Sequence, residues 1–166
     1  MIRRLQADDQ VAYAAVRLRG LELHPEAFGT GAPDWKAGTP EQVRLTLARG
    51  GGDDFVLGAF AADALVGLIG LKREKKFAVG HKATIWGFFV EPDHRRAGHG
   101  RALLAELVAV ARTLEGLDFL RALVTTTNDA ALRVFEAAGF TRYGLEQGGI
   151  QVAGQRHDQA YLRLDL

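Results

Sequence analysis

The stretch FFVEPDHRRAGHGRALL, residues 88–104, decides how this chain folds. An apolar run typical of a strand ends at Val90, and Pro92 prevents the strand from continuing. A basic turn with Gly98 and Gly100 follows, and an amphipathic helical pattern begins directly after it. A strand, a glycine-bearing turn and a helix start together direct backbone N–H groups at an anion such as phosphate. The stretch therefore predicts a phosphate-binding turn.

Two other phosphate loops are excluded by the residues at this turn. The P-loop of nucleoside triphosphatases needs Gly-Lys followed by Ser or Thr, which is absent here. The dinucleotide-binding fingerprint needs a third glycine, and Leu103 stands at that position. On spacing alone, the turn also fits a plain strand-to-helix connection whose glycines serve only the backbone. Both interpretations stay open at this point.

The composition limits both the fold and the chemistry. With 166 residues, of which 48% are hydrophobic and 25% charged, residues 1–166 have the make-up of one globular domain. The chain contains neither Cys nor Ser, so disulfides, thiolate metal sites and Ser or Cys nucleophiles are excluded, and we expect no metal.

The charge pattern and the apolar runs exclude several classes of partner. A net charge of +1 gives no support for a nucleic-acid partner. The longest apolar stretch, residues 57–71, is interrupted by Asp63 and several glycines, so we expect no membrane partner. The first ten residues lack the apolar core of a signal peptide. We therefore expect a soluble cytoplasmic protein.

Hydrophobic periodicity predicts an α/β (α+β) fold in the order β α α β β β α β α β β, with a mixed sheet and helices on its faces. The predicted strands are residues 2–5, 55–61, 65–71, 83–90, 119–126, 141–146 and 159–166. Four helices are predicted. The first is capped by Asp8 and has an apolar face made of Val11, Ala14, Ala15, Leu18 and Leu21. The second is capped by Thr39 and ends near residues 50–52, the third begins after Gly100, and the fourth runs from Asn128 to Gly139. Gly87 inside a strand indicates a bulge or a close backbone approach.

Two motifs resemble those of the GNAT (Gcn5-related N-acetyltransferase) superfamily. The turn is similar to its acetyl-CoA-binding motif, with the residues Val90-x-Pro92-x-x-Arg95-Arg96-x-Gly98-x-Gly100. Downstream, the family pattern Asn-x-x-Ala-x-x-Leu-Tyr-x-x-x-Gly-Phe is matched by Asn128-x-x-Ala131-x-x-Val134-Phe135-x-x-x-Gly139-Phe140. The motifs stand in the family's order, a helix and a strand apart, and the resemblance covers residues 55–140.

The resemblance implies an N-acetyltransferase that moves the acetyl group of acetyl-CoA to a primary amine by direct attack in a ternary complex. It implies a mostly antiparallel mixed sheet in which the fourth strand splays from the fifth, so that the pantetheine arm lies between them. Asn128 either contacts the cofactor or only caps its helix. The residues implied to bind the cofactor are Phe88, Phe89, Val90, Arg95, Arg96, Ala97, Gly98, His99, Gly100, Arg101, Asn128 and Phe135.

The catalytic groups are less well defined by the sequence. Phe135 stands where the family carries a tyrosine general acid, so either Tyr143 substitutes for it or the thiolate leaves without an acid. Glu91, at the end of the cofactor strand, and His81, before it, are the candidate bases.

The acceptor and the assembly are left open in the same way. The candidate acceptor-binding residues are Phe28 and Trp35, with the acids Glu22 and Asp34, in the N-terminal region and Trp86 on the cofactor strand. A small-molecule amine is favoured, with a protein or peptide amine as the alternative and an acyl-CoA-binding sensor of little activity as a second one. Residues 159–166 alternate like an edge strand, which is compatible with a homodimer.

Overall fold

The computed structural model describes residues 1–48 and 52–166. In these residues seven strands form one mixed sheet in the order β1-β2-β3-β4-β5-β7-β6. Only β4 and β5 are parallel among the described neighbours. The strands are β1 (Ile2–Arg4), β2 (Asp54–Ala61), β3 (Ala64–Arg73), β4 (Lys82–Val90), β5 (Phe119–Thr125), β6 (Thr141–Val152) and β7 (Gln155–Asp165). The helices are α1 (Gln10–Leu23), α2 (Ala32–Lys36), α3 (Pro40–Ala48), α4 (His99–Ala111) and α5 (Asp129–Ala137). The predicted fold class is confirmed.

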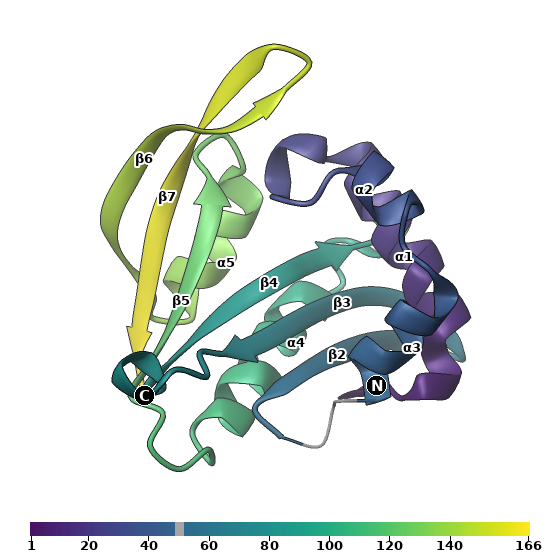
Figure 1. The fold of residues 1–166 in the computed structure, drawn as a ribbon, viewed down its shortest axis with the longest axis horizontal. Helices are drawn as coiled ribbons and strands as arrows, with labels where there is room; N and C mark the ends of the chain where they lie inside the picture. Colours follow the sequence, from purple (N-terminus) through teal and green to yellow (C-terminus); the bar gives the residue numbers. More distant parts are fainter. Residues whose placement is uncertain (49–51) are drawn as a thin grey trace.

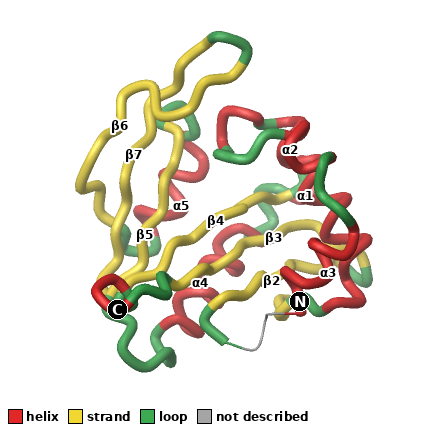
Figure 2. Tube along the Cα trace, viewed as in Figure 1, coloured by secondary structure: helices red, strands yellow, loops and turns green. Residues whose placement is uncertain are grey.

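Helices cover both faces of the sheet, and each face has its own core. One core joins α4 and α5 to the strands through residues such as Leu57, Leu104 and Phe135. The other joins α1 and α3 to β2, β3 and β4 through residues such as Tyr13 and Leu68. In Figures 1 and 2 the helices α1, α2 and α3 gather on one side of the molecule, and α4 and α5 lie behind the strands. The sheet therefore separates an N-terminal helical layer from the layer that contains the glycine-bearing turn.

The helices around the turn form where the sequence predicts them. The stripe of α4 is buried as expected, at Leu103, Leu104, Leu107, Val108 and Ala111. Its burial on the sheet removes a continuous apolar surface from water, which is what holds α4 in place behind β4.

Three predicted helix-end signals can be compared with the structure. The Asn128 side chain caps α5 by accepting a hydrogen bond from the Ala131 N–H at 3.1 Å, and Gly139 follows the helix in the left-handed region with φ +92°. Thr39 and Gln42 form a reciprocal capping box at the start of α3. The predicted end of α3 near residues 50–52 falls largely outside the described residues.

The prediction for α1 is wrong about the buried face. A 3-10 turn at Ala7–Asp9 precedes the helix, so Asp8 lies in that turn and does not cap α1. Of the predicted apolar face only Leu21 is buried, and the buried residues are Tyr13, Val16, Arg17, Gly20 and Leu21. The helix carries two stripes, and the one that packs on the sheet contains an arginine, which periodicity counts as exposed. The other stripe, with Val11 and Leu18, lines a crevice beside α2 and α3.

The C-terminal hairpin also departs from the prediction. Strands β6 and β7 are both longer than expected, and their pairing continues from Thr141↔Arg163 to Val152↔Gln155. The segment read as an edge strand lies mostly in β7, between β5 and β6, so the edges of the described sheet are β1 and β6. The argument from alternation for a homodimer is therefore wrong.

A glycine on β3 makes room for the indole of Trp86 on β4. Gly70 pairs with Trp86 across the two strands, and a Cβ at Gly70 would overlap the indole ring. We predict that Gly70→Ala lowers the free energy of unfolding by about 1–3 kcal/mol, because the ring or the strand must shift. Chemical denaturation measures the change.

Gly29→Ala is the matched control, since a Cβ there would meet no atom of residues 1–48 or 52–166 within 4 Å. Equal stability of the two variants would show that Trp86 is not held against β3.

Candidate functional site

The strands β4 and β5 separate halfway along their length. Their parallel ladder pairs Lys82–Ala83–Thr84–Ile85 with residues 119–122 and ends there. Beyond it, Gly87 adopts a left-handed φ of +68°, and the register between β3 and β4 shifts at the same place. Figure 1 shows the two strands starting together and diverging. The predicted splay and the predicted bulge at Gly87 are both present, and they leave backbone groups of β4 facing the gap.

The turn before α4 presents a row of free backbone donors. Gly98, the N-cap of α4, lies in the left-handed region with φ +86°, and Arg96 before it has φ +61°. The first turn closes with the Ala102 N–H donating to the Gly98 carbonyl. Within the described residues no acceptor is recorded for the N–H groups of residues 96–101. Free N–H donors at the positive end of a helix dipole are the features that bind anions in other proteins, so this turn is a candidate anion site.

The basic side chains of the turn divide into two groups. Arg95 folds back, with its Nε donating to the Val90 carbonyl at 2.9 Å and its Nη2 lying 2.9 Å from His24 Nε2. Arg96 and Arg101 are exposed at the mouth of the turn. His94 and His99 stack edge to face with ring centroids 6.2 Å apart. Arg95 thus fixes the turn to β4, and Arg96 and Arg101 stay available to an incoming anion.

Successive side chains of β4 point to opposite faces of the sheet. Phe88 points to the α4 side, where a Cβ at Gly100 would lie 3.2 Å from its ring, and it meets Phe135 edge to face at 5.6 Å. Phe89 points to the α1 side, where a Cβ at Gly20 would lie 3.0 Å from its ring. Phe135 is 2% exposed, so the residue in the family's tyrosine position is part of the core. Asn128 lies nearby as the cap of α5.

The three catalytic candidates lie in different places. Glu91 follows β4 at the end that bears the turn, is 16% exposed, and accepts a hydrogen bond from Arg19 Nε on α1 at 2.7 Å. His81 lies at the opposite end of β4, where its ring meets Phe119. Tyr143 lies on the edge strand β6, 55% exposed, against the ring of Tyr161. The structure therefore brings only Glu91 to the turn.

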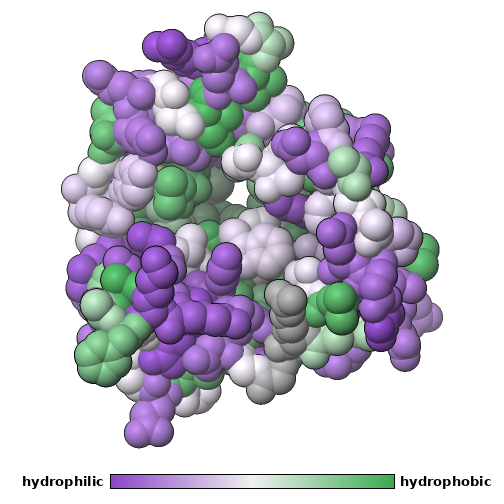
Figure 3. Space-filling view, viewed as in Figure 1, coloured by the Kyte–Doolittle hydropathy of each residue, from purple (hydrophilic) through white to green (hydrophobic). Residues whose placement is uncertain are grey.

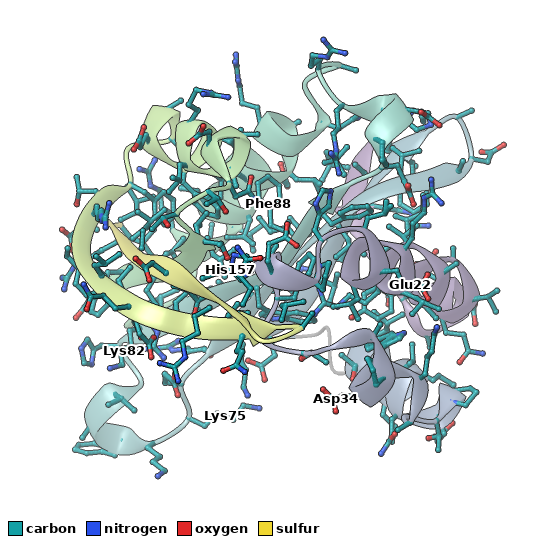
Figure 4. The ribbon with its side chains drawn as sticks, turned by 90° about the horizontal axis from the view of Figure 1, so that it is seen from above. Glu22, Asp34, Lys75, Lys82, Phe88 and His157 are labelled. Carbon is teal, nitrogen blue, oxygen red and sulfur yellow. The ribbon has the colours of Figure 1, made fainter. Side chains whose placement is uncertain are left out.

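The acidic residues predicted to receive an amine are engaged elsewhere. Glu22 accepts from Lys36 Nζ at 2.6 Å, and the Asp34 carboxylate accepts from the Gly31 N–H at the start of α2. Figure 4 shows both carboxylates on α1 and α2, apart from Phe88. Trp35 packs edge to face on Tyr13. The predicted aromatic and acidic pocket is therefore not assembled as such.

Two of the predicted aromatic residues flank a residue that sequence reasoning missed. The guanidinium carbon of Arg17 lies 4.7 Å from the ring centre of Phe28 and 5.8 Å from that of Trp86. Arg17 is 6% exposed, and burial lowers its pKa. Burial also raises the pKa of Tyr13, one helical turn away, to about 12. The only signal in the sequence for Arg17 was a charged residue inside an apolar stripe. Hydrophobic periodicity assigns such a residue to the surface.

One face of the molecule is hollowed. Figure 3 shows a depression between the β6–β7 hairpin and the segment around α2. The short 3-10 turn Pro25–Ala27 borders it, and the Glu26 carbonyl accepts a hydrogen bond from Thr125 Oγ1 at the end of β5.

In the described part of the chain, no helix is long and apolar enough to cross a membrane.

Comparison with known sequences agrees with this geometry. The model of the acetyltransferase (GNAT) family matches residues 18–140. The N-alpha-acetyltransferase RimI of Mycobacterium tuberculosis is 35% identical over 98 residues, 59% of this chain and 59% of that protein. The mycothiol acetyltransferase of Thermobispora bispora is 29% identical over 143 residues, 83% of this chain and 45% of that protein. The chain spans less than two thirds of the length of these curated relatives.

Solved structures share the whole fold at low sequence identity. An acetyltransferase of the GNAT family from Streptococcus pneumoniae superposes with a TM-score of 0.90 at 20% identity, covering 100% of this chain and 99% of that one. YncA of Salmonella typhimurium, solved with its cofactor acetyl-CoA, superposes with a TM-score of 0.86 at 21% identity, covering 99% of this chain and 92% of that one. The family match, the splayed strands and the glycine-bearing turn lead to one conclusion: the chain belongs to the GNAT acetyltransferase family.

Proposed function

We propose that this protein transfers the acetyl group of acetyl-CoA to a small primary amine. The observation that carries the proposal is the turn at Gly98. Its free N–H groups lie at the mouth of the gap between β4 and β5. The diphosphate would lie on residues 96–101, and the pantetheine arm would follow the unpaired edge of β4 as an added strand does. The free N–H groups of the turn, the open edge of β4 and the close packing of Gly100 against Phe88 fit the diphosphate and pantetheine arm of acetyl-CoA.

The residues of the chain favour direct transfer. Bound acetyl-CoA supplies a thioester, and with no Ser or Cys in the sequence the amine itself is the nucleophile. A nitrogen–carbon bond forms, the carbon–sulfur bond breaks, the amine loses a proton and the thiolate accepts one. A backbone N–H of β4 beyond Ile85 is the donor proposed for the developing oxyanion. Phe135 has no proton to give, and a thiol of pKa near 8.5 leaves without a strong acid.

Glu91 is the base that we propose for the acceptor ammonium. It stands at the turn-bearing end of β4, and its side chain reaches the α1 layer, where the acceptor would enter. The 2.7 Å bond to Arg19 Nε fixes the position of the carboxylate. His81, at the far end of the strand, and Tyr143, on β6, are not retained in this mechanism.

The depression favours a small acceptor over a folded protein. The Thr125 hydrogen bond to the Glu26 carbonyl ties the segment before α2 to the end of β5. This contact narrows the approach to the gap from the α1 side. The likeness to a RimI protein supports the alternative, an N-acetyltransferase of protein or peptide amines. The phenylalanine at position 135 supports the second alternative, an acyl-CoA sensor with little activity.

Thiol release from acetyl-CoA over a panel of amines tests the proposal. We expect release that a small amine stimulates and that saturates with the amine. Greater stimulation by peptides than by any small amine would favour the protein acetyltransferase. Tight CoA binding without stimulated release would favour the sensor. Absence of CoA affinity in calorimetry would overturn the whole assignment.

Gly98 offers a direct test of the anion site. Among the described residues, a Cβ at Gly98 would meet no atom within 4 Å, so it would be free of the protein and exposed to a ligand at the turn. We predict that Gly98→Ala weakens CoA binding about tenfold in calorimetry, through lost donor geometry and steric contact.

Gly154→Ala is the control for backbone strain. Gly154, in the turn between β6 and β7, also has a positive φ, +81°, and open space at its Cβ position. Both variants should lose about 1 kcal/mol of stability, and only Gly98→Ala should lose CoA affinity. Equal CoA affinities in the two variants would place the diphosphate elsewhere.

The role of Glu91 can be tested against a neighbouring carboxylate. We predict that Glu91→Gln lowers kcat about 10²-fold or more and removes the acidic limb of the pH profile of kcat/KM, because the amide cannot accept the proton. Asp93→Asn, an exposed carboxylate in the same turn, should leave both unchanged. A wild-type pH profile in Glu91→Gln would rule out this carboxylate as the base.

A further inference from the structure

Arg17 is a buried cation that forms no ion pair with the described residues. It lies on the face of α1 that packs on the sheet and is 6% exposed. Its Nε and Nη1 are buried and have no hydrogen-bond partner among the described residues. No ion pair of this part of the chain includes it. The residue therefore presents unused donors inside the molecule.

Three carboxylates that lie on α1 or pair with a residue of α1 or its C-cap already have partners. Glu91 pairs with Arg19, Glu22 pairs with Lys36, and Glu26 lies 3.5 Å from His24. None of these carboxylates can neutralise Arg17 without giving up its present partner. The buried hydroxyl of Tyr13, one turn earlier on the same face, is a second polar group without a partner among the described residues.

The guanidinium is aimed at the point where β4 leaves β5. A Cβ at Gly87 would lie 3.5 Å from Arg17 Nη1. Gly87 is the left-handed residue of the bulge, two residues after the end of the parallel ladder. The rings of Phe28 and Trp86 both lie within cation–π distance of the guanidinium. The unused donors therefore lie beside the place where the thioester would be attacked, on the α1 side of the sheet.

A buried charge without a partner costs several kcal/mol, and two aromatic rings offset only part of that cost. A bound oxyanion would offset this cost, because a guanidinium N–H donates a charge-assisted hydrogen bond to a carboxylate oxygen. An Arg at this place would also repel an acceptor that carries several ammonium groups, so polyamines are disfavoured. A carboxylate on the acceptor itself satisfies the donors and directs its amine toward Gly87.

We infer that Arg17 binds the carboxylate of the acceptor, and that the acceptor is a small amine of the amino-acid class. The inference rests on the proposed function, since it names the substrate class of the same site. A peptide N-terminus lacks a carboxylate next to its amine and does not meet this requirement.

Matched acceptors and matched variants test the inference. L-phenylalanine carries the carboxylate, and 2-phenylethylamine is the same amine without it. We expect the wild type to prefer L-phenylalanine in kcat/KM, and Arg17→Gln to reduce that preference about tenfold or more. Arg17→Lys should recover part of it. Arg112→Gln, an exposed arginine at the end of α4, is the control and should keep the wild-type preference.

A second measurement separates recognition from packing. Loss of a buried unpartnered charge should not lower the unfolding midpoint of Arg17→Gln. A lower midpoint, with equal losses for both amines, would show that Arg17 only supports the core. Equal kcat/KM for both amines in the wild type would also overturn the inference.

Failure of the proposed function gives a different result. In that case no amine stimulates thiol release, and calorimetry of the two compounds with the CoA-loaded protein becomes the test. Binding of L-phenylalanine that Arg17→Gln abolishes would support the anion site in a protein that is not an acetyltransferase. Binding of neither compound, or of both equally, would overturn the site.

Discussion

The structure depends on where the parallel ladder between β4 and β5 ends. The last pair of this ladder is Ile85 with Ala122, and beyond it the two strands no longer pair with each other. A continuous ladder would satisfy the backbone groups of β4 and close the gap, leaving no edge to which a carrier arm could add. The left-handed residue at Gly87 bends β4 at this point, and glycine adopts that conformation without the penalty that a Cβ imposes. The separation is therefore built into the backbone.

The two faces of β4 at this bend have different surroundings. On the α4 side, Phe88, Gly100 and Phe135 pack closely, and the free N–H groups of the turn lie at their edge. On the α1 side, the strand faces Arg17 and a depression bordered by the segment before α2. An anionic carrier and a second substrate can then approach the gap from opposite faces of one sheet. This arrangement fits the proposed direct transfer, in which both ligands are bound at the same time.

Much of the carrier side could be predicted from the sequence. The apolar stripe of α4, the Asn128 cap and the bulge at Gly87 follow from local rules that act within a few residues, and the structure shows all three. The proposed acceptor side could not be predicted in the same way. It is formed by contacts between distant segments, such as Arg17 with Trp86 and Thr125 with Glu26, which leave no local pattern.

The wrong prediction for the buried face of α1 and the failure to identify Arg17 have the same cause. Reading a sequence by hydrophobic periodicity assigns every charged residue to the surface, because burial of an unpaired charge opposes folding. That rule holds when folding alone shapes a position. At Arg17 it fails on the sheet-facing stripe of α1, next to the bulge and between two aromatic rings. In the proposed function a bound carboxylate neutralises this charge, so the departure from the folding pattern lies on the proposed acceptor side of the gap.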